Sequence, residues 1–128
     1  MSSVIGDELG LLVRRVDGAR RASLVGIDGL AIATAPPGGN GDEEAWETLA
    51  TDYAALLRKL SRGQGDLSFG EPRELLLRAE QAQLLLMPVT DDCFLVLLLG
   101  PKSPAGKAAH MMRGAGMRLR DELDTSLH

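Results

Sequence analysis

The chain has 128 residues, with 14 Lys and Arg against 18 Asp and Glu, and a net charge of −4. That length fits one domain, 1–128, able to bury about two-thirds of its unfolded surface, and the acidic balance disfavours nucleic acid as a partner. With one Cys, no signal-peptide pattern and no apolar run near the roughly 18 residues of a membrane span, we expect a cytoplasmic protein without membrane insertion.

The first third of the chain predicts a helix followed by a hairpin. The helix is indicated by apolar residues that recur every three or four positions, and Asp28-Gly29 separates two β-prone runs in "ASLVGIDGLAIATA". This dipeptide favours a two-residue turn, because both positions tolerate positive φ. The stretch "PPGGNG" at 36–41 predicts a loop. The apolar residues of the helix are Ile5, Leu9, Leu12, Val13 and Val16.

A long second helix is predicted from Asp42 onward. Acidic residues at 42–44 lie at its positive dipole end, and a basic group lies at its negative end, before the glycines of "RGQGD". Its stripe consists of Trp46, Leu49, Tyr53, Leu56, Leu57 and Leu60.

The segment 72–99 permits two interpretations. Its many Glu, Leu, Arg, Ala and Gln residues favour a helix over 72–87 by propensity alone. Leucine triplets at 75–77 and 84–86, and the turn-like "TDD" before "CFLVLLLG", instead fit three short buried strands. We expect strands here. A last helix follows, with Ser103 as N-cap, Pro104 at its first position and an apolar stripe of Ala108, Met111, Met112, Ala115, Leu119 and Leu123.

The strand-to-helix junction at 97–112 is similar to a phosphate-binding loop, but the spacing does not fit. A P-loop needs four residues between its glycines and a Ser or Thr after its Lys, whereas Gly100 and Gly106 enclose five residues and Lys107 precedes alanine. The loop also holds two prolines, which lack N–H donors. We therefore expect a strand end and a helix start, while an anion contact by Lys102 or Lys107 stays open.

No catalytic, cofactor or metal site is predicted. Cys93 could act as a nucleophile with His110, but it begins an apolar strand, where a free Cys usually serves as a small buried residue. Asp91 and Asp92 are adjacent in a turn and have no further acidic ligand at loop spacing, so turn chemistry accounts for them.

The ordered pattern resembles the Roadblock/LC7 family over about residues 5–123. The resemblance lies in the opening amphipathic helix, the apolar strand ending in Asp28-Gly29-Leu30, the following strand of small residues and the acidic start of a long helix with "LATDYAALLRKL". It implies an α-β-β-α-β-β-β-α sandwich: a five-stranded antiparallel sheet with the long helix on one face and the terminal helices on the other. Members are commonly homodimers, and bacterial ones often regulate small Ras-like GTPases.

The long helix is the predicted interaction element. Two packings fit its wide apolar stripe. In one, the whole stripe packs on the sheet of its own chain; in the other, part of it packs on the same helix of a second copy, and the resemblance favours this one. Strand 73–79 is the expected edge that pairs with its symmetry mate. The predicted dimer interface is Trp46, Leu49, Ala50, Tyr53, Ala54 and Leu57 of the helix, with Leu75 and Leu77 of the strand.

The functional hypothesis is a non-catalytic homodimeric adaptor that binds a small Ras-like GTPase and modulates its hydrolysis or location. Partner binding is predicted at Arg58, Lys59 and Arg62, for which helix-end electrostatics is the alternative explanation. A GTPase-independent scaffold or a small-molecule sensor is the alternative function, and an NTP hydrolase using Lys107 is a third.

Overall fold

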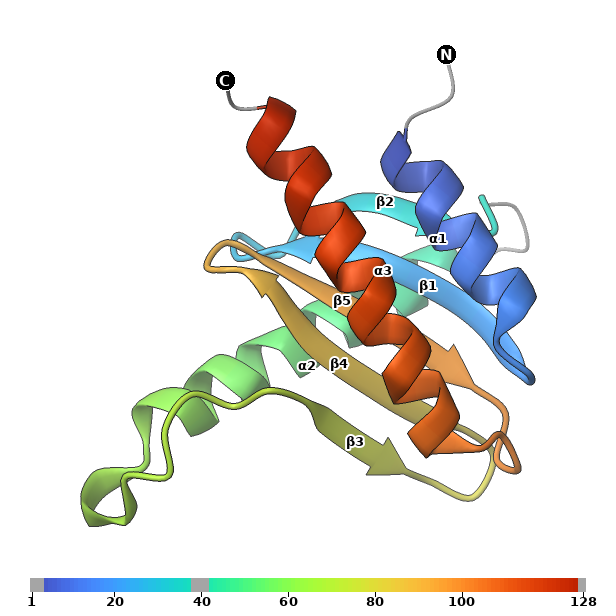
Figure 1. The fold of residues 1–128 in the computed structure, drawn as a ribbon. Coiled ribbons are helices and arrows are strands. Elements are labelled where there is room, and N and C mark those ends of the chain that lie inside the picture. Colours follow the sequence, from blue (N-terminus) through green and yellow to red (C-terminus); the bar gives the residue numbers. More distant parts are fainter. Residues whose placement is uncertain (1–3, 38–41, 127–128) are drawn as a thin grey trace.

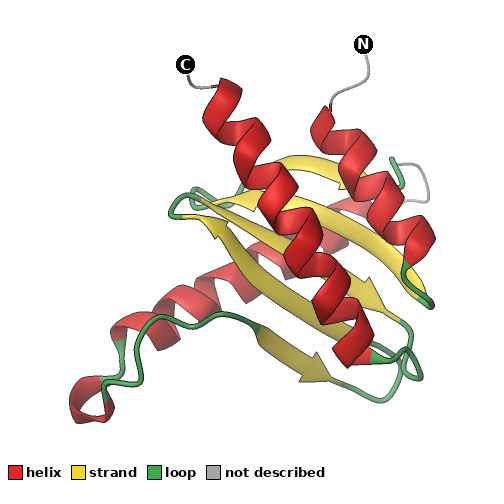
Figure 2. Cartoon of the chain, viewed as in Figure 1, coloured by secondary structure: helices red, strands yellow, loops and turns green. Residues whose placement is uncertain are grey.

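The computed structural model describes residues 4–37 and 42–126, so most of the predicted loop at 36–41 lies outside the described residues. Figure 1 shows the chain from end to end, and Figure 2 shows its helices and strands. The elements follow the predicted order, and none of the described helices is long and apolar enough to cross a bilayer. In chain order the elements are α1 (Val4–Arg15), β1 (Ala19–Gly26), β2 (Ala31–Ala35), α2 (Glu43–Arg62), the short 3₁₀ helix η1 (Gly65–Leu67), β3 (Leu75–Arg78), β4 (Gln83–Thr90), β5 (Cys93–Leu99) and α3 (Ala105–Ser126).

The five strands form one antiparallel sheet in the order β2-β1-β5-β4-β3. Helix α2 crosses one face of this sheet, while α1 and α3 lie side by side on the other face (Figure 1). The predicted fold is therefore confirmed. The order leaves β2 and β3 as the two edges, so both ends of the sheet have an unpaired side among the described strands.

The segment that allowed two interpretations forms strands, because its leucines are needed on both faces of the sheet. In β4, Leu84 and Leu86 pack in the cluster under α2, whereas Leu85 and Met87 pack in the cluster under α1 and α3. Alternate side chains of a strand point to opposite faces, so a continuous apolar run suits a strand that is covered on both sides. This burial outweighs the helix propensity of the segment.

The hairpin between β1 and β2 contains the predicted Asp28-Gly29 turn, but its loop is longer than predicted. The Gly26 carbonyl accepts a hydrogen bond from Gly29 N–H at 3.0 Å, and Gly26 N–H donates to the Leu30 carbonyl at 2.9 Å. Gly29 has φ +88°, and the Asp28 carboxylate accepts from Leu30 N–H. The connection is a three-residue loop with glycine in the left-handed position, not a two-residue turn.

The start of α3 also differs from the prediction. The helix begins at Ala105, and the Pro104 carbonyl accepts the first helical hydrogen bond, from Ala108 N–H. Ser103 is therefore not the N-cap and Pro104 is not the first helical residue. The Ser103 Oγ is directed at Gly18, where an added Cβ would lie 1.8 Å from it, so tertiary packing takes this side chain away from the helix end.

Candidate partner-binding surface

The inner side of helix α2 packs on the sheet of its own chain. Five residues spaced along its length are buried there, together with Val25, Phe94 and Val96 from the central strands. These five are Trp46, Ala50, Tyr53, Ala54 and Leu57. Because their side chains are already covered within the chain, they hold the helix on the sheet.

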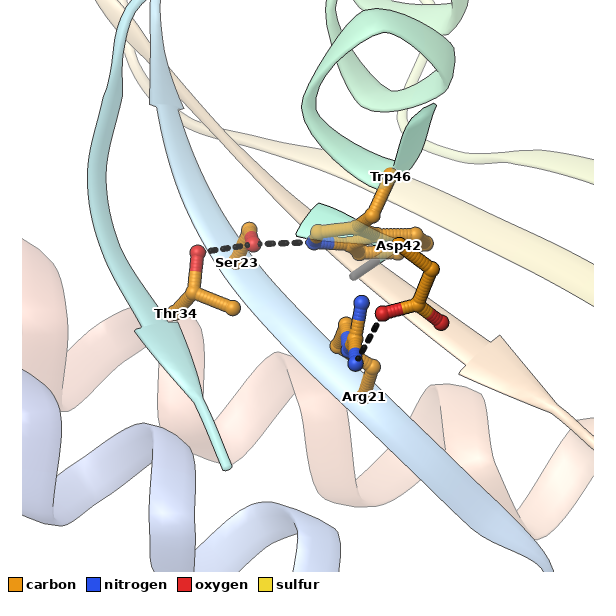
Figure 3. A network of polar contacts seen from close by, with 5 residues as sticks. All are labelled: Arg21, Ser23, Thr34, Asp42 and Trp46. Atoms are coloured by element: carbon orange, nitrogen blue, oxygen red, sulfur yellow. Dashed lines mark hydrogen bonds and ion pairs between the residues drawn. The ribbon is translucent and has the colours of Figure 1, made fainter. Parts of the chain in front are cut away.

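A polar network fixes the N-terminal end of α2 (Figure 3). The Trp46 indole Nε1 donates to Ser23 Oγ at 2.7 Å, and Ser23 Oγ lies 2.7 Å from Thr34 Oγ1, which links the helix to β1 and β2. The guanidinium of Arg21 pairs with the Asp42 carboxylate at 3.1 Å and lies 6.0 Å from the centre of the Trp46 ring. The buried indole therefore has a hydrogen-bond partner and a cation beside its ring.

Tyr53 fixes the helix near the opposite edge of the sheet. Its hydroxyl lies 2.8 Å from the Leu75 carbonyl and 3.0 Å from the Leu84 carbonyl, and one hydroxyl proton serves both acceptors. Burial raises the pKa of Tyr53 to about 12, while the backbone N–H of Leu77 acts in the opposite direction. The phenol therefore stays neutral at physiological pH and ties the edge strand β3 to α2.

One flank of α2, next to its buried side, carries a row of exposed leucines. Leu49, Leu56 and Leu60 are separated by seven and four positions, which places them on one side of the helix. Leu77 of β3 lies two positions after Leu75, which packs under α2, so it belongs to the same face of the sheet. These four side chains, 43% to 50% exposed, are called the leucine surface below.

The structure separates the predicted interface residues into two groups. Trp46, Ala50, Tyr53, Ala54 and Leu57 are buried in the core of the chain itself, with 0% to 6% of their surface exposed. Of the remaining three, Leu49 and Leu77 are exposed and Leu75 is half-buried. Leu56 and Leu60 were members of the predicted stripe but not of the predicted interface, and their exposure adds them to the candidate surface.

The edge strand beside this surface is short. Strand β3 covers Leu75–Arg78 within the predicted range 73–79, and among the described strands it pairs only with β4. Its other side therefore has backbone groups available for pairing, next to Leu77.

The three basic residues at the end of α2 do not share one environment. The Arg58 guanidinium donates from Nη1 to the Ile27 carbonyl at 2.7 Å and so holds the turn between β1 and β2. Thr51 supports the same turn by donating to the Gly29 carbonyl at 2.7 Å. Lys59 and Arg62 are exposed. Two of the three predicted partner-binding residues are therefore free to meet a partner, and Arg58 has a structural contact.

The other chemical candidates occupy ordinary structural positions. Cys93 is buried at the start of β5, Asp91 and Asp92 form the exposed turn before it, and His110 is exposed on α3. Within residues 4–37 and 42–126, no group of three or more His, Cys, Asp or Glu side chains is placed to hold a metal ion.

The chain is similar to known proteins in sequence pattern and in fold. The family model for the Roadblock/LC7 domain matches residues 5–99. A Roadblock/LC7 domain from Streptomyces avermitilis has a TM-score of 0.79 at 23% identity, covering 94% of this chain and 98% of that one. For MglB of Myxococcus xanthus the TM-score is 0.81 at 16% identity, with coverages of 94% and 95%. MglC of the same organism has a TM-score of 0.60 at 28% identity, and the match covers 91% of this chain and 96% of that one. No curated protein matches the chain in sequence.

Proposed function

The chain belongs to the Roadblock/LC7 family, and from that membership we propose that it is a cytoplasmic, homodimeric, non-catalytic regulator of a small Ras-like GTPase. The observation that carries the proposal is the family match over residues 5–99. The likeness to MglB and MglC supports it, because the bacterial branch of the family often regulates such GTPases.

The proposed dimer uses the leucine surface. Four leucines that are close to half exposed on one face of a monomer form an apolar patch of the kind that marks a protein–protein contact. A two-fold axis beside α2 would bring the same patch from both copies together and place the two β3 edges next to one another. One solved MglB structure is described as having a tetrameric arrangement, which supports self-association among structural relatives.

The proposed GTPase contact includes Lys59 and Arg62. Both are exposed cations in the last turn of α2, on a chain whose net charge is otherwise negative. Arg58 is engaged with the Ile27 carbonyl, so we assign it to the turn and not to the active site of a partner. We propose that the regulator acts by ordering the catalytic residues of the GTPase itself. An arginine supplied in trans is the other route, and Arg62 is the exposed arginine of this contact.

The dimer is tested by placing charge in the leucine surface. Leu56→Asp combined with Leu60→Asp should convert the protein to a monomer in light scattering coupled to size-exclusion chromatography, because the carboxylates would be desolvated in the interface. Leu30→Asp is the matched control, since Leu30 is 67% exposed and lies in the β1–β2 loop. If the double variant remains a dimer, the leucine surface is not the interface.

The GTPase is tested by capture from cell lysate with the purified protein as bait, in GDP and in a non-hydrolysable GTP analogue. Selective capture of a Ras-like GTPase in one nucleotide state is expected, and the isolated pair then enters a hydrolysis assay. Lys59→Ala with Arg62→Ala should weaken capture, whereas Arg14→Ala with Arg15→Ala, on α1, should not. Capture of other proteins regardless of nucleotide would favour a GTPase-independent scaffold.

A further inference from the structure

A groove lies at the end of the sheet that carries the β4–β5 turn, mainly on the α1 and α3 side. It has a volume of about 940 Å³ and is formed by three segments: the end of the loop before β3, the β4–β5 turn and the last turns of α3. Figure 1 shows that the C-terminal part of α3 and the β4–β5 turn lie at the same end of the sheet. Most of the groove therefore lies away from α2, and Glu71, which accepts a hydrogen bond from Ser61 Oγ at 3.0 Å, connects it to the end of that helix.

The floor of the groove is apolar. Val89 and Cys93 are buried members of the cluster under α1 and α3, and Leu123 packs against that cluster. Pro72 and Pro88 add apolar walls. A floor of this kind favours a ligand that has at least one apolar side chain, because a small hydrated cation would leave it unused.

The rim of the groove is acidic. Glu71, Asp91, Asp92 and Asp124 contribute four carboxylates against the single guanidinium of Arg120, which leaves three net negative charges. None of the ion pairs found in residues 4–37 and 42–126 involves these carboxylates.

The end of α3 increases the negative potential at the groove. Its last turn has no basic residue, so the negative end of the helix dipole is not compensated by a cation of that turn. Leu123 and Asp124 stand in the last turns of this helix and line the groove.

We propose that this groove binds a basic segment of a protein partner, in which two or more Lys or Arg side chains flank an apolar one. The apolar side chain packs against the partly exposed Pro72, Pro88 and Leu123, above the buried Val89 and Cys93, and the cations meet the carboxylates of the rim. The groove lies mainly on the α1 and α3 side of the sheet, so most of its lining is distinct from the leucine surface.

The test uses a fluorescein-labelled peptide, Lys-Leu-Arg-Lys-Leu-Arg-Lys, and a second peptide of the same charge in which serine replaces both leucines. Fluorescence anisotropy measures binding to the full chain at about 0.05 M and about 0.3 M salt, because salt screens exposed charges. The leucine peptide should bind more tightly than the serine peptide, and its binding should weaken at the higher salt.

Two sets of variants locate the binding. Asp91→Asn, Asp92→Asn and Asp124→Asn together should weaken the leucine peptide about tenfold, given the usual strength of a few exposed charge pairs. The matched control removes three exposed carboxylates from the start of α2 and should leave binding unchanged: Glu43→Gln, Glu44→Gln and Glu47→Gln. Circular dichroism verifies that each variant is folded.

Arg120→Glu serves as a gain-of-binding variant that does not depend on removing turn residues. It adds negative charge to the rim and should tighten binding of the leucine peptide. The proposal is overturned if the wild-type chain does not bind, if both carboxylate triples weaken binding equally, or if the serine peptide or free spermine binds as tightly as the leucine peptide. The last result would indicate a general cation site.

Discussion

Replacing Ser23 by alanine tests whether the polar network under α2 stabilises the fold. Ser23 is completely buried in β1, and its Oγ is the only link between the Trp46 indole and the Thr34 hydroxyl. Ser23→Ala keeps the strand but leaves the indole N–H in the core without its acceptor. The variant should unfold more easily than the wild type.

The expected loss follows from the two contacts that disappear. A buried donor left without an acceptor costs about 1 to 3 kcal/mol, and the part-buried contact to Thr34 Oγ1 contributes less, about 0.5 to 1 kcal/mol. We expect the free energy of unfolding to fall by about 2 to 3 kcal/mol, or roughly 10 °C in Tm for a domain of this size. Thr34→Val removes only the outer contact and should cost about 1 kcal/mol.

Urea unfolding at fixed protein concentration measures these differences, with circular dichroism as the main signal. Trp46 is the only Trp, so its fluorescence reports on the site itself and should give the same midpoint if unfolding is two-state. Thr48→Ala, at an exposed position of α2, is the control. A Ser23→Ala variant within about 0.5 kcal/mol of the wild type would show that the network adds little to stability.

Three further predictions follow from single residues. Gly18→Ala should lower Tm strongly, because Gly18 has φ +80° and the new Cβ would lie 1.8 Å from Ser103 Oγ. Gly106→Ala should be neutral or slightly stabilising, because the space around Gly106 is open. The folded-state pKa of Tyr53, about 12, is above its unfolded value of 10.0, so the unfolded chain loses the phenol proton first as pH rises. The contribution of the neutral phenol to stability is therefore complete below pH 10 and should be lost between pH 10 and 12. Tyr53→Phe should lack that dependence, and because Tyr53 is the only Tyr, tyrosinate absorbance measures its pKa directly. Arg58→Ala should lower Tm by freeing the β1–β2 loop, but Lys59→Ala should change Tm little; equal effects in thermal unfolding would contradict the distinction between them.

The fold could be predicted where periodicity and turn chemistry agree. The strand pattern of β4 outweighs helix propensity because Leu84, Leu85 and Leu86 alternate between two buried clusters. Errors arose where a distant part of the chain decides a local feature. Ser103 has the right residue type and position for an N-cap, yet its oxygen packs on Gly18, which lies 85 positions earlier in the sequence. No local pattern contains that contact.

The candidate surface could be predicted only in part, because the stripe on α2 is wider than one contact face. A helix turns by about 100° per residue, so Leu49, Leu56 and Leu60 lie only slightly around the helix from Trp46 and Tyr53. The sequence therefore predicts one broad apolar stripe. Which part of it meets the sheet depends on how α2 is placed across the strands. That placement is fixed by the Ser23 side chain of β1 and by the backbone carbonyls of Leu75 in β3 and Leu84 in β4.

The two anchors on α2 explain why the leucine surface suits association. The Trp46 network joins the start of the helix to β1 and β2, and the Tyr53 hydroxyl joins its middle to β3 and β4. A helix held at both places has little freedom to lose when a second copy packs on it, and ordering of the interface is one of the costs of association. Tyr53 also aligns the β3 edge with the leucine surface. The hydrogen bonds of Trp46 and Tyr53 therefore make the surface proposed for self-association rigid. These buried polar contacts are also the features that a sequence pattern predicts least well.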